Sequence, residues 1–252
     1  MPKTFGTPGN YVLAEARKKF CRYIVLVLIA AVVISYLCGL LHGLMFDKNP
    51  RSTSLVVIIM IIVGLVYCSR RYISRWTGKL MDDAIAFRKG AVGEGLTADD
   101  LSKLPDTYSV FHDLTHPSIG GNIDHIVVGP TGVFALETKN WKGHVNLSGQ
   151  GVITVDGTRD ETRHGKAILG RALNLKNKIE ALSNISTFVQ AVMIFPLASV
   201  KVDPGTRCNL DVQQLSHLEE YLKRPSPSRT LTPAQVTTIT RDLVALFKPV
   251  IQ

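Results

Sequence analysis

The longest hydrophobic pattern in the chain lies near its N-terminus, in two apolar segments with a short polar stretch between them. Residues 23–46 contain no Asp, Glu, Lys or Arg, and residues 52–69 form a second uncharged run of 18 residues. The first segment is long enough to cross a bilayer as a helix, and the second is close to the lower limit. Neither segment shows a polar face. The pattern therefore predicts a transmembrane helical hairpin rather than two buried core helices, with residues 47–51 as its turn.

Basic residues flank the outer ends of this pair. Residues 17–22 hold four Lys or Arg and residues 70–75 hold three, whereas the connecting residues 47–51 hold two. The positive-inside rule then predicts that both termini and the soluble domain are cytoplasmic, at an inner or plasma membrane. A basic stretch before an apolar run is also typical of a signal peptide. This run is longer than that and no small-residue cleavage site follows it, so we expect it to be retained.

Between residues 120 and 143 the pattern changes to that of a β-hairpin. Residues 123–128 and 133–136 are rich in β-branched and aromatic side chains, which favour strands. Residues 129–132, Gly-Pro-Thr-Gly, supply a tight turn between them.

The turn decides which polar side chains meet at the open end of this hairpin. If the strands pair symmetrically about the Pro130–Thr131 bond, Asp124 lies across from Glu137, and the period of two places Lys139 on the same face. A type I turn with a bulged glycine would shift the pairing by one residue and turn Asp124 to the other face. The sequence leaves both registers open.

The rest of the soluble part reads as further short strands and helices, which predicts a mixed sheet with helices packed on it. Glycines at 90, 93 and 95 are expected to interrupt the helical pattern that follows the apolar segments. The predicted helices are 72–89, 96–104, 166–182, 213–222 and 233–247, and the other predicted strands are 108–114, 144–147, 152–155 and 188–195.

Charge and cysteine content narrow the class of protein. The net charge is +9, but residues 1–75 hold 10 of the 29 basic residues and 2 of the 20 acids, so residues 76–252 are nearly neutral. Most of the basicity is thus explained by membrane topology rather than by a nucleic-acid surface. Residues 139–178 are a local exception, with eight basic and three acidic residues. The four cysteines show no metal-type spacing and imply no disulfide framework.

Two carboxylates at one strand end suggest a cation site. Asp124 and Glu137 offer the oxygen ligands that magnesium or manganese prefers, with water in the remaining positions. Lys139 is placed to orient an attacking water or to stabilise charge on a phosphoryl group. The simpler interpretation is that the acids are solvated and that Lys139 pairs with one of them. His125 alternates away from Asp124 and is interpreted as a packed or hydrogen-bonded histidine.

Three stretches together resemble a known family. They are Gly93-Glu94-Gly95, the run GNIDHIVVGPTGVF at residues 121–134, and ETKNWKG at residues 137–143. Over roughly residues 88–200 the chain resembles the nuclease-related domain, abbreviated NERD, which belongs to the restriction-endonuclease-like superfamily with the PD-(D/E)xK active site. The combined motif is far more specific than an isolated Asp and ExK.

The resemblance implies roles for individual residues. Asp124 matches the metal-binding aspartate, Glu137 and Lys139 the acid and lysine of the ExK motif, and Glu94 the acid of the first helix. The implied metal is Mg or Mn, held by Asp124, Glu137 and Thr138. The family often carries Gln in the helix after the hairpins, where this chain has Arg171 or Asn174. The positive charge of Lys142, Arg163, Lys166 and Arg171, and not the resemblance, makes these residues candidates for contact with nucleic acid. A solvated helix face is an equally good interpretation of the last three.

The expected architecture is therefore α/β, with a two-helix transmembrane hairpin followed by a restriction-endonuclease-like mixed sheet flanked by helices. Its expected parts are a cytoplasmic N-terminal arm (1–20), two transmembrane helices (21–69), a juxtamembrane helical linker (70–90), the nuclease-related domain (91–205) and a C-terminal helical extension packed on it (206–252).

Two functions remain open at this point. The first is a membrane-anchored cytoplasmic nuclease that depends on Mg or Mn and hydrolyses phosphodiester bonds, with DNA as the expected substrate and RNA as a further one. The second is a catalytically silent module of the same fold that binds nucleic acid or a protein at the membrane. The lipid bilayer is the other expected partner, and the number of subunits is left open.

Overall fold

The computed structural model describes residues 1–46, 82–206 and 208–247. Residues 82–101 are helical throughout. The other helices are α1 (Asn10–Phe46), α3 (Thr162–Ser183), α4 (Leu218–Lys223) and α5 (Pro233–Phe247), with 3-10 turns η1 (Pro117–Ile119) and η2 (Leu215–His217). The strands are β1 (Lys3–Phe5), β2 (Ser109–His116), β3 (Gly121–Gly129), β4 (Gly132–Thr138), β5 (His144–Leu147), β6 (Ile153–Val155), β7 (Arg159–Asp160), β8 (Val189–Phe195), β9 (Ser199–Val202) and β10 (Leu210–Gln214).

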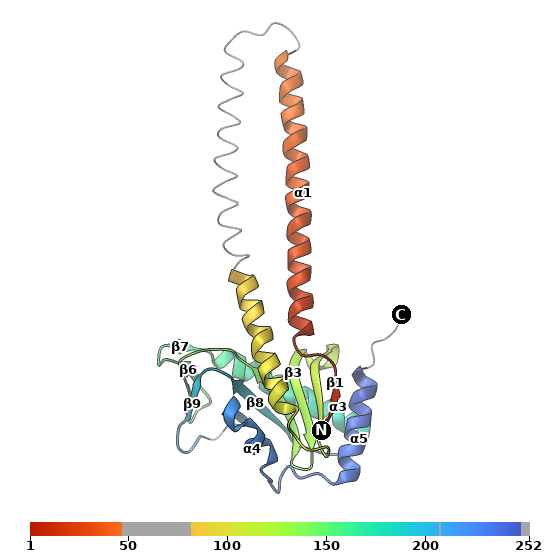
Figure 1. Cartoon of the computed structure of the whole chain (residues 1–252), viewed down its shortest axis with the longest axis vertical. Coiled ribbons are helices and arrows are strands. Elements are labelled where there is room, and N and C mark those ends of the chain that lie inside the picture. Colours follow the sequence, from red (N-terminus) through yellow and green to blue (C-terminus); the bar gives the residue numbers. More distant parts are fainter. Residues whose placement is uncertain (47–81, 207, 248–252) are drawn as a thin grey trace. The chain divides into compact units, whose positions relative to one another are not determined.

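The predicted mixed sheet is confirmed. Six strands run in the order β1-β2-β3-β4-β8-β10 (Figure 1). The β2–β3 and β3–β4 pairs are antiparallel, and the β1–β2, β4–β8 and β8–β10 pairs are parallel. A second sheet has the order β7-β6-β5-β9 and contains the expected small hairpin of β5 and β6.

Alternation along the central strands produces two apolar cores, one on each face of the main sheet. On β4, Val133 and Ala135 pack with residues of α3 and α5, whereas Phe134 and Leu136 pack with Leu101 and with residues of α4. Side chains on both faces of β4 and β8 are buried throughout. These strands are covered on both sides, which explains their nearly continuous apolar sequence.

The hairpin has the symmetric register. Pairing runs from Gly129 opposite Gly132 to His125 opposite Leu136, around a two-residue turn at Pro130 and Thr131. Gly132 adopts φ +131°, in the region that favours glycine. The regular pairing ends one step before Asp124 and Glu137.

The strands are irregular where the hairpin pairing ends. Ile123 and Ile126 pack in the same core although they are three residues apart, so the alternation of β3 is broken between them. On β2 the matching position is Asp113, which has φ +56° and is missing from the β2–β3 ladder. Asp124 therefore lies in an irregular part of its strand.

The helix before the sheet differs from the expectation of two pieces. Residues 82–101 form one continuous helix through all three glycines. A Cβ atom added to Gly93 would lie 2.8 Å from Cβ of Asn140 and 3.4 Å from Cγ2 of Thr138. Gly93 thus allows the helix backbone to approach the end of β4, and it does not break the helix. The expected helix 72–89 begins outside the described residues.

The N-terminal segment also differs from the expected arm. β1 pairs in parallel with β2, and Phe5 stacks on Phe111 with ring centroids 4.8 Å apart. The chain divides into two compact units, one made of residues 1–12 and 89–252 and the other of residues 13–88. The first residues belong to the same unit as the sheet because they supply its edge strand.

One helix in the described part of the chain is long and apolar enough to cross a membrane. It covers Asn10–Leu37 within α1, with a mean hydropathy of 2.4, and the side chains of that window are not buried. The second predicted span, residues 52–69, lies outside the described residues. The described structure therefore contains one apolar helix, where the sequence predicted a hairpin of two.

The C-terminal region is only partly the predicted helical extension. α5 has the predicted bounds, but residues 210–214 form β10, which pairs in parallel with β8. The predicted helix 213–222 is wrong in its first part, because residues 213–214 belong to β10, and η2 and α4 follow without a break. The main sheet therefore extends past the expected boundary at residue 205.

The close approach at Gly93 gives a stability prediction. We expect Gly93→Ala to lower the free energy of unfolding by about 1–3 kcal/mol, because overpacking outweighs the roughly 1 kcal/mol that Ala gains over Gly in a helix. Urea unfolding of the full-length chain in detergent measures it. Gly95→Ala is the matched control on the same helix, since nothing lies within 4 Å of the added Cβ. Equal destabilisation by both changes would contradict the packing assigned to Gly93.

A buried histidine pair gives a pH prediction. His112 Nδ1 lies 2.7 Å from His125 Nδ1, and burial followed by the charge of His112 lowers the pKa of His125 from 6.5 to about 3. The unfolded chain then binds a proton below pH 6.5 that the folded chain does not, so this contribution to stability is complete above pH 6.5 and is lost as pH falls towards 3.

The matching variant is His125→Gln, which keeps hydrogen-bonding capacity but does not titrate. Its free energy of unfolding should fall less between pH 7 and pH 5 than that of the wild type, by up to about 1.4 kcal/mol per pH unit below 6.5. His217→Gln removes an exposed imidazole and serves as the control. An unchanged pH dependence in His125→Gln would show that the pair takes up protons in the folded state.

Candidate functional site

Five residues that the sequence analysis named as site residues lie close together where β3 and β4 stop pairing. Asp124 comes from the irregular part of β3, Glu137 from the end of β4, and Lys139 from the residue that follows β4. Glu94 comes from the helix 82–101, and Arg171 from α3. The three acids are buried, with 4% of Glu94 and 7% each of Asp124 and Glu137 exposed. The structure thus brings together the four residues predicted to be catalytic.

Glu137 is held between two cations. Lys139 Nζ lies 2.7 Å from Glu137 Oε1, and Arg171 Nη1 lies 2.8 Å from Glu137 Oε2. Both are charge-assisted hydrogen bonds, which are the stronger kind. The side chains of Lys139 and Arg171 are themselves mostly buried. Each carboxylate oxygen of Glu137 therefore has its own cationic partner.

Asp124 is held by neutral donors instead. Its Oδ2 accepts a hydrogen bond from the backbone N–H of Thr138 at 2.8 Å, and its Oδ1 accepts one from Nδ2 of Asn122 at 3.3 Å. Burial, and then the negative charges of Glu137 and Glu94, raise the pKa of Asp124 well above its ordinary value. Lys139 and the Thr138 N–H act in the opposite direction.

Glu94 is the least satisfied of the three acids. Burial raises its pKa to about 7, with further contributions from Asp113 and Glu137, while the backbone N–H of Gly9 and the charge of Lys139 lower it. Its Oε2 is buried and has no hydrogen-bond partner among the described residues. This atom is a free acceptor beside the other carboxylates.

Lys139 stays protonated in this setting. Burial lowers its pKa, but the charges of Glu137 and Asp124 and the hydrogen bond to Glu137 outweigh burial, so the pKa is raised overall. At neutral pH Lys139 is a cation and a hydrogen-bond donor. It cannot act there as a base.

The donor set fits a hard divalent cation. Mg²⁺ is usually held by one or two carboxylates and completes its shell with water. Asp124 and Glu137 could supply two. Burial, and then the charges of Glu137 and Glu94, raise the pKa of Asp124, and a cation would offset both effects. Within the described residues, no three His, Cys, Asp or Glu side chains are already arranged as a metal cluster. The Thr138 hydroxyl donates a hydrogen bond to Thr97 Oγ1 at 3.1 Å, which leaves the lone pairs of its oxygen free.

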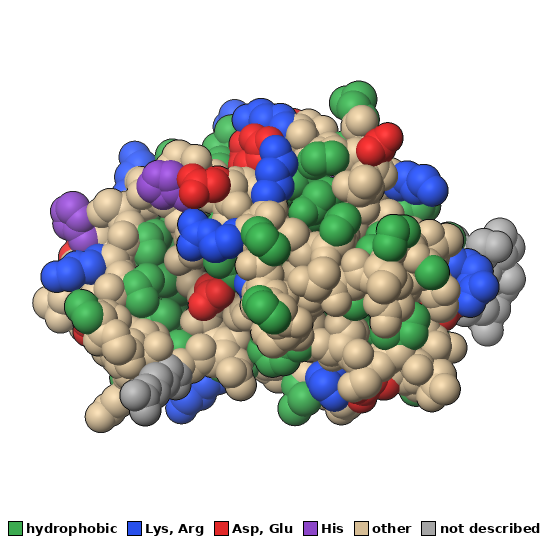
Figure 2. Space-filling model, turned by 90° about the horizontal axis from the view of Figure 1, so that it is seen from below, with side chains coloured by type: hydrophobic (Ala, Val, Ile, Leu, Met, Phe, Trp, Pro, Cys, Tyr) green, Lys and Arg blue, Asp and Glu red, His purple; other side chains and the backbone are tan. Residues whose placement is uncertain are grey.

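The predicted nucleic-acid contacts fall into two groups. Lys142, Arg163 and Lys166 are exposed, the first after β4 and the other two in the first turns of α3. Arg171 is bound to Glu137, so the structure places it in the carboxylate cluster. On the face shown in Figure 2, basic and acidic side chains are interspersed and form no patch of one sign.

Trp141 packs against the domain. Its ring lies 5.5 Å from that of Phe195 and 5.7 Å from that of His164, and the Arg159 guanidinium lies 5.0 Å from its centroid. The ring is therefore engaged by neighbours on three elements.

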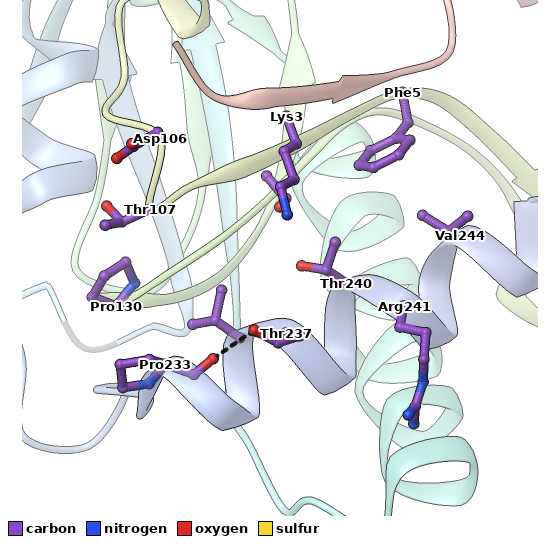
Figure 3. A pocket seen from close by; sticks show the side chains of 12 residues that line it. Lys3, Phe5, Asp106, Thr107, Pro130, Pro233, Thr237, Thr240, Arg241 and Val244 are labelled. Atoms are coloured by element: carbon purple, nitrogen blue, oxygen red, sulfur yellow. Dashed lines mark hydrogen bonds between the residues drawn. The ribbon is translucent and has the colours of Figure 1, made fainter.

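A pocket of about 400 Å³ lies elsewhere, between β1, the hairpin turn and α5 (Figure 3). Phe5, Pro130 and Val244 line its apolar part, and the ammonium of Lys3 points into it. None of the buried carboxylates lines this pocket.

Sequence reasoning missed the residues that support the carboxylates. Arg171 was assigned to nucleic acid, and Asp113, Asn122 and Thr97 were given no role. One signal was present for Asn122, since the period of two places it on the same side of a regular strand as Asp124. The others depend on contacts between elements far apart in the sequence.

The segment that carries the site is also the segment that resembles known proteins. Residues 89–196 match the family model of the nuclease-related domain. An uncharacterized protein of Bacillus anthracis is 34% identical over 94 residues, which are 36% of this chain and 39% of that relative. The chain thus matches about two-fifths of the relative's length. No solved structure matches. The segment that matches the family model contains Glu94, Asp124, Glu137, Lys139 and Arg171.

Proposed function

We propose that this protein is a membrane-anchored nuclease that hydrolyses phosphodiester bonds with the help of Mg²⁺ or Mn²⁺, with DNA as the first expected substrate and RNA as a further one. The observation that carries the proposal is the buried group of Asp124, Glu137 and Lys139 at one end of the hairpin. The match of residues 89–196 to the nuclease-related domain supports the same chemistry.

Each residue of the group has a distinct task in this proposal. Asp124 and Glu137 would hold the cation, which when bound polarises a phosphate oxygen and lowers the pKa of a bound water. Lys139, protonated beside Glu137, donates a hydrogen bond to the phosphoryl oxygen on which negative charge develops. Glu94 Oε2 accepts a hydrogen bond from the attacking water. Hydrolysis then joins the water oxygen to phosphorus and breaks the bond to one ester oxygen. Glu94, with a pKa of about 7, takes the proton of the attacking water, and the ester oxygen leaves as a hydroxyl group after taking up a proton from solvent.

Arg171 sets the charge balance of the group. Without a second cation, Lys139 would face Asp124, Glu137 and Glu94 alone in a buried setting. Unpaired buried charge is costly, so Arg171 stabilises the group of acids by pairing with Glu137 Oε2. A divalent cation would take over part of that pairing.

Membrane anchoring is the second part of the proposal. It rests on the apolar window Asn10–Leu37 of α1, whose large hydrophobic side chains are exposed, and on the basic residues within 17–22. A long unburied apolar helix is unfavourable in water and favourable in lipid.

A silent binding module of the same fold is the second candidate. One observation favours it: Lys139 and Arg171 already pair with the two oxygens of Glu137, so a metal cation at Glu137 would lie close to two other positive charges. The near neutrality of residues 76–252 points the same way, because nonspecific binding of nucleic acid relies on positive charge.

Cleavage assays separate the two candidates. The full-length chain in detergent, mixed with linear and circular DNA and with RNA, should cleave when Mn²⁺ or Mg²⁺ is added. Lys139→Met removes the donor that stabilises developing charge and should reduce the rate about 100-fold or more, and Glu137→Gln should do the same. The full-length chain is needed because residues 1–12 belong to the same compact unit as the sheet.

Lys201→Met is the matched control, since Lys201 is an exposed lysine on β9 in the smaller sheet. It should cleave as the wild type does. Equal rates for wild type and Lys139→Met would rule out the assigned site, and absence of cleavage with either cation would leave the silent module as the function.

A further inference from the structure

The start of α1 is bound directly to the acidic end of the domain. The backbone N–H of Asn10 donates to Asp113 Oδ2 at 2.5 Å, and that of Tyr11 donates to the same oxygen at 3.4 Å. These are the first helical N–H groups, which have no partner inside the helix. The backbone N–H of Gly9 lowers the pKa of both Asp113 and Glu94. Asp113 therefore acts as a cap from a distant strand.

Asp113 is held in an unfavourable backbone conformation to do this. Its φ of +56° lies in the left-handed region, where residues other than Gly are uncommon and the strain is of order 1–3 kcal/mol. The same position is where β2 loses its pairing with β3. The irregularity that turns Asp113 towards α1 thus lies beside the one that frees Asp124.

Asn122 joins the two aspartates. Its Nδ2 lies 3.3 Å from Asp113 Oδ1 and 3.3 Å from Asp124 Oδ1. Its Oδ1 accepts a hydrogen bond from Thr115 Oγ1 at 3.0 Å, which fixes the amide with its N–H groups facing the acids. Asp124 in turn accepts from the Thr138 N–H. The hydrogen bonds are continuous from the first turn of α1 to the end of β4.

We propose that Asp113 is a positioning residue that couples the N-terminus of the apolar helix α1 to Asp124 through Asn122. Displacement of the first turn of α1 frees Asp113, releases Asn122 and loosens Asp124. The orientation of the predicted cation ligand then depends on how the start of the membrane helix is seated. The effect on catalysis rests on the proposed function, whereas the effect on Asp124 does not.

Hydrogen exchange of backbone amides in the full-length chain tests the coupling without cation or substrate. Asp113→Gly removes the carboxylate and also relieves the backbone strain, since Gly tolerates positive φ. It should speed exchange of the Asn10, Tyr11 and Thr138 amides about tenfold. Asp113→Asn keeps an acceptor oxygen and should stay close to the wild type. Asp106→Gly, at an exposed acid just before β2, is the control.

A second variant gives the direction of the coupling. Asn122→Ala breaks the bridge but leaves Asp113 on α1, so it should speed exchange at Thr138 and not at Asn10. If Asp113→Gly speeds Asn10 and Tyr11 but leaves Thr138 as in the wild type, the proposal is overturned. If Asp113→Gly does not fold, the Asn122→Ala variant provides the test by itself. In that case, an exchange rate of the Thr138 amide equal to that of the wild type would overturn the proposal.

The effect of Asp113 on catalysis is measured by the dependence of the cleavage rate on Mn²⁺ concentration. Asp113→Gly should raise the Mn²⁺ concentration for half-maximal cleavage about tenfold and recover the wild-type maximum rate at high Mn²⁺, and Asp113→Asn should restore the wild-type dependence. A lower maximum rate with an unchanged Mn²⁺ dependence would contradict positioning of a cation ligand. If the wild type cleaves nothing, the proposed nuclease function fails, while the exchange pattern still decides the coupling.

Discussion

Buried carboxylates are stable only where opposite charge or N–H groups surround them, and this constraint shapes the whole end of the β3–β4 hairpin. Glu137 takes two cations, Lys139 and Arg171. Asp124 takes a backbone N–H and an amide. Lys139 follows β4 and Arg171 lies on α3, so burial of the acids requires that the hairpin and α3 are both folded and packed together. The charge balance of the site therefore depends on tertiary structure and not on one motif.

Two departures from regular geometry make this arrangement possible. Gly93 lets the helix 82–101 pack against the residues that follow β4, which brings Glu94 to the acids. The break in pairing at Asp113 and Asp124 frees two carboxylates from the sheet, one turned to the start of α1 and the other to Thr138. A regular ladder would have pointed these side chains into an apolar core.

Local sequence patterns predicted the strands and helices whose hydrophobic positions recur at a regular spacing over several residues. The hairpin, the strand 188–195 and the helix 233–247 follow from alternation and turn residues, and the structure has them close to the predicted bounds. The register of the hairpin was left open by the sequence, because Gly-Pro-Thr-Gly is compatible with two turn types, and the structure shows the symmetric one. β1 and β10 were missed because each is a short edge strand whose pairing partner is distant in sequence. The glycines of helix 82–101 were read as interruptions, since intrinsic propensity carries no information about close packing. The acids and lysine of the site were predicted from their spacing and from the family resemblance, whereas Arg171 and Asp113 emerge only from contacts between elements.

Titration of the full-length chain with Mn²⁺, followed by the electron paramagnetic resonance signal of the free ion, tests the proposed cation site most directly. Saturable binding that is lost in both Asp124→Asn and Glu137→Gln, with folding preserved, is the predicted result. Binding by these variants equal to that of the wild type, or no binding by the wild type, would contradict a divalent cation held between Asp124 and Glu137.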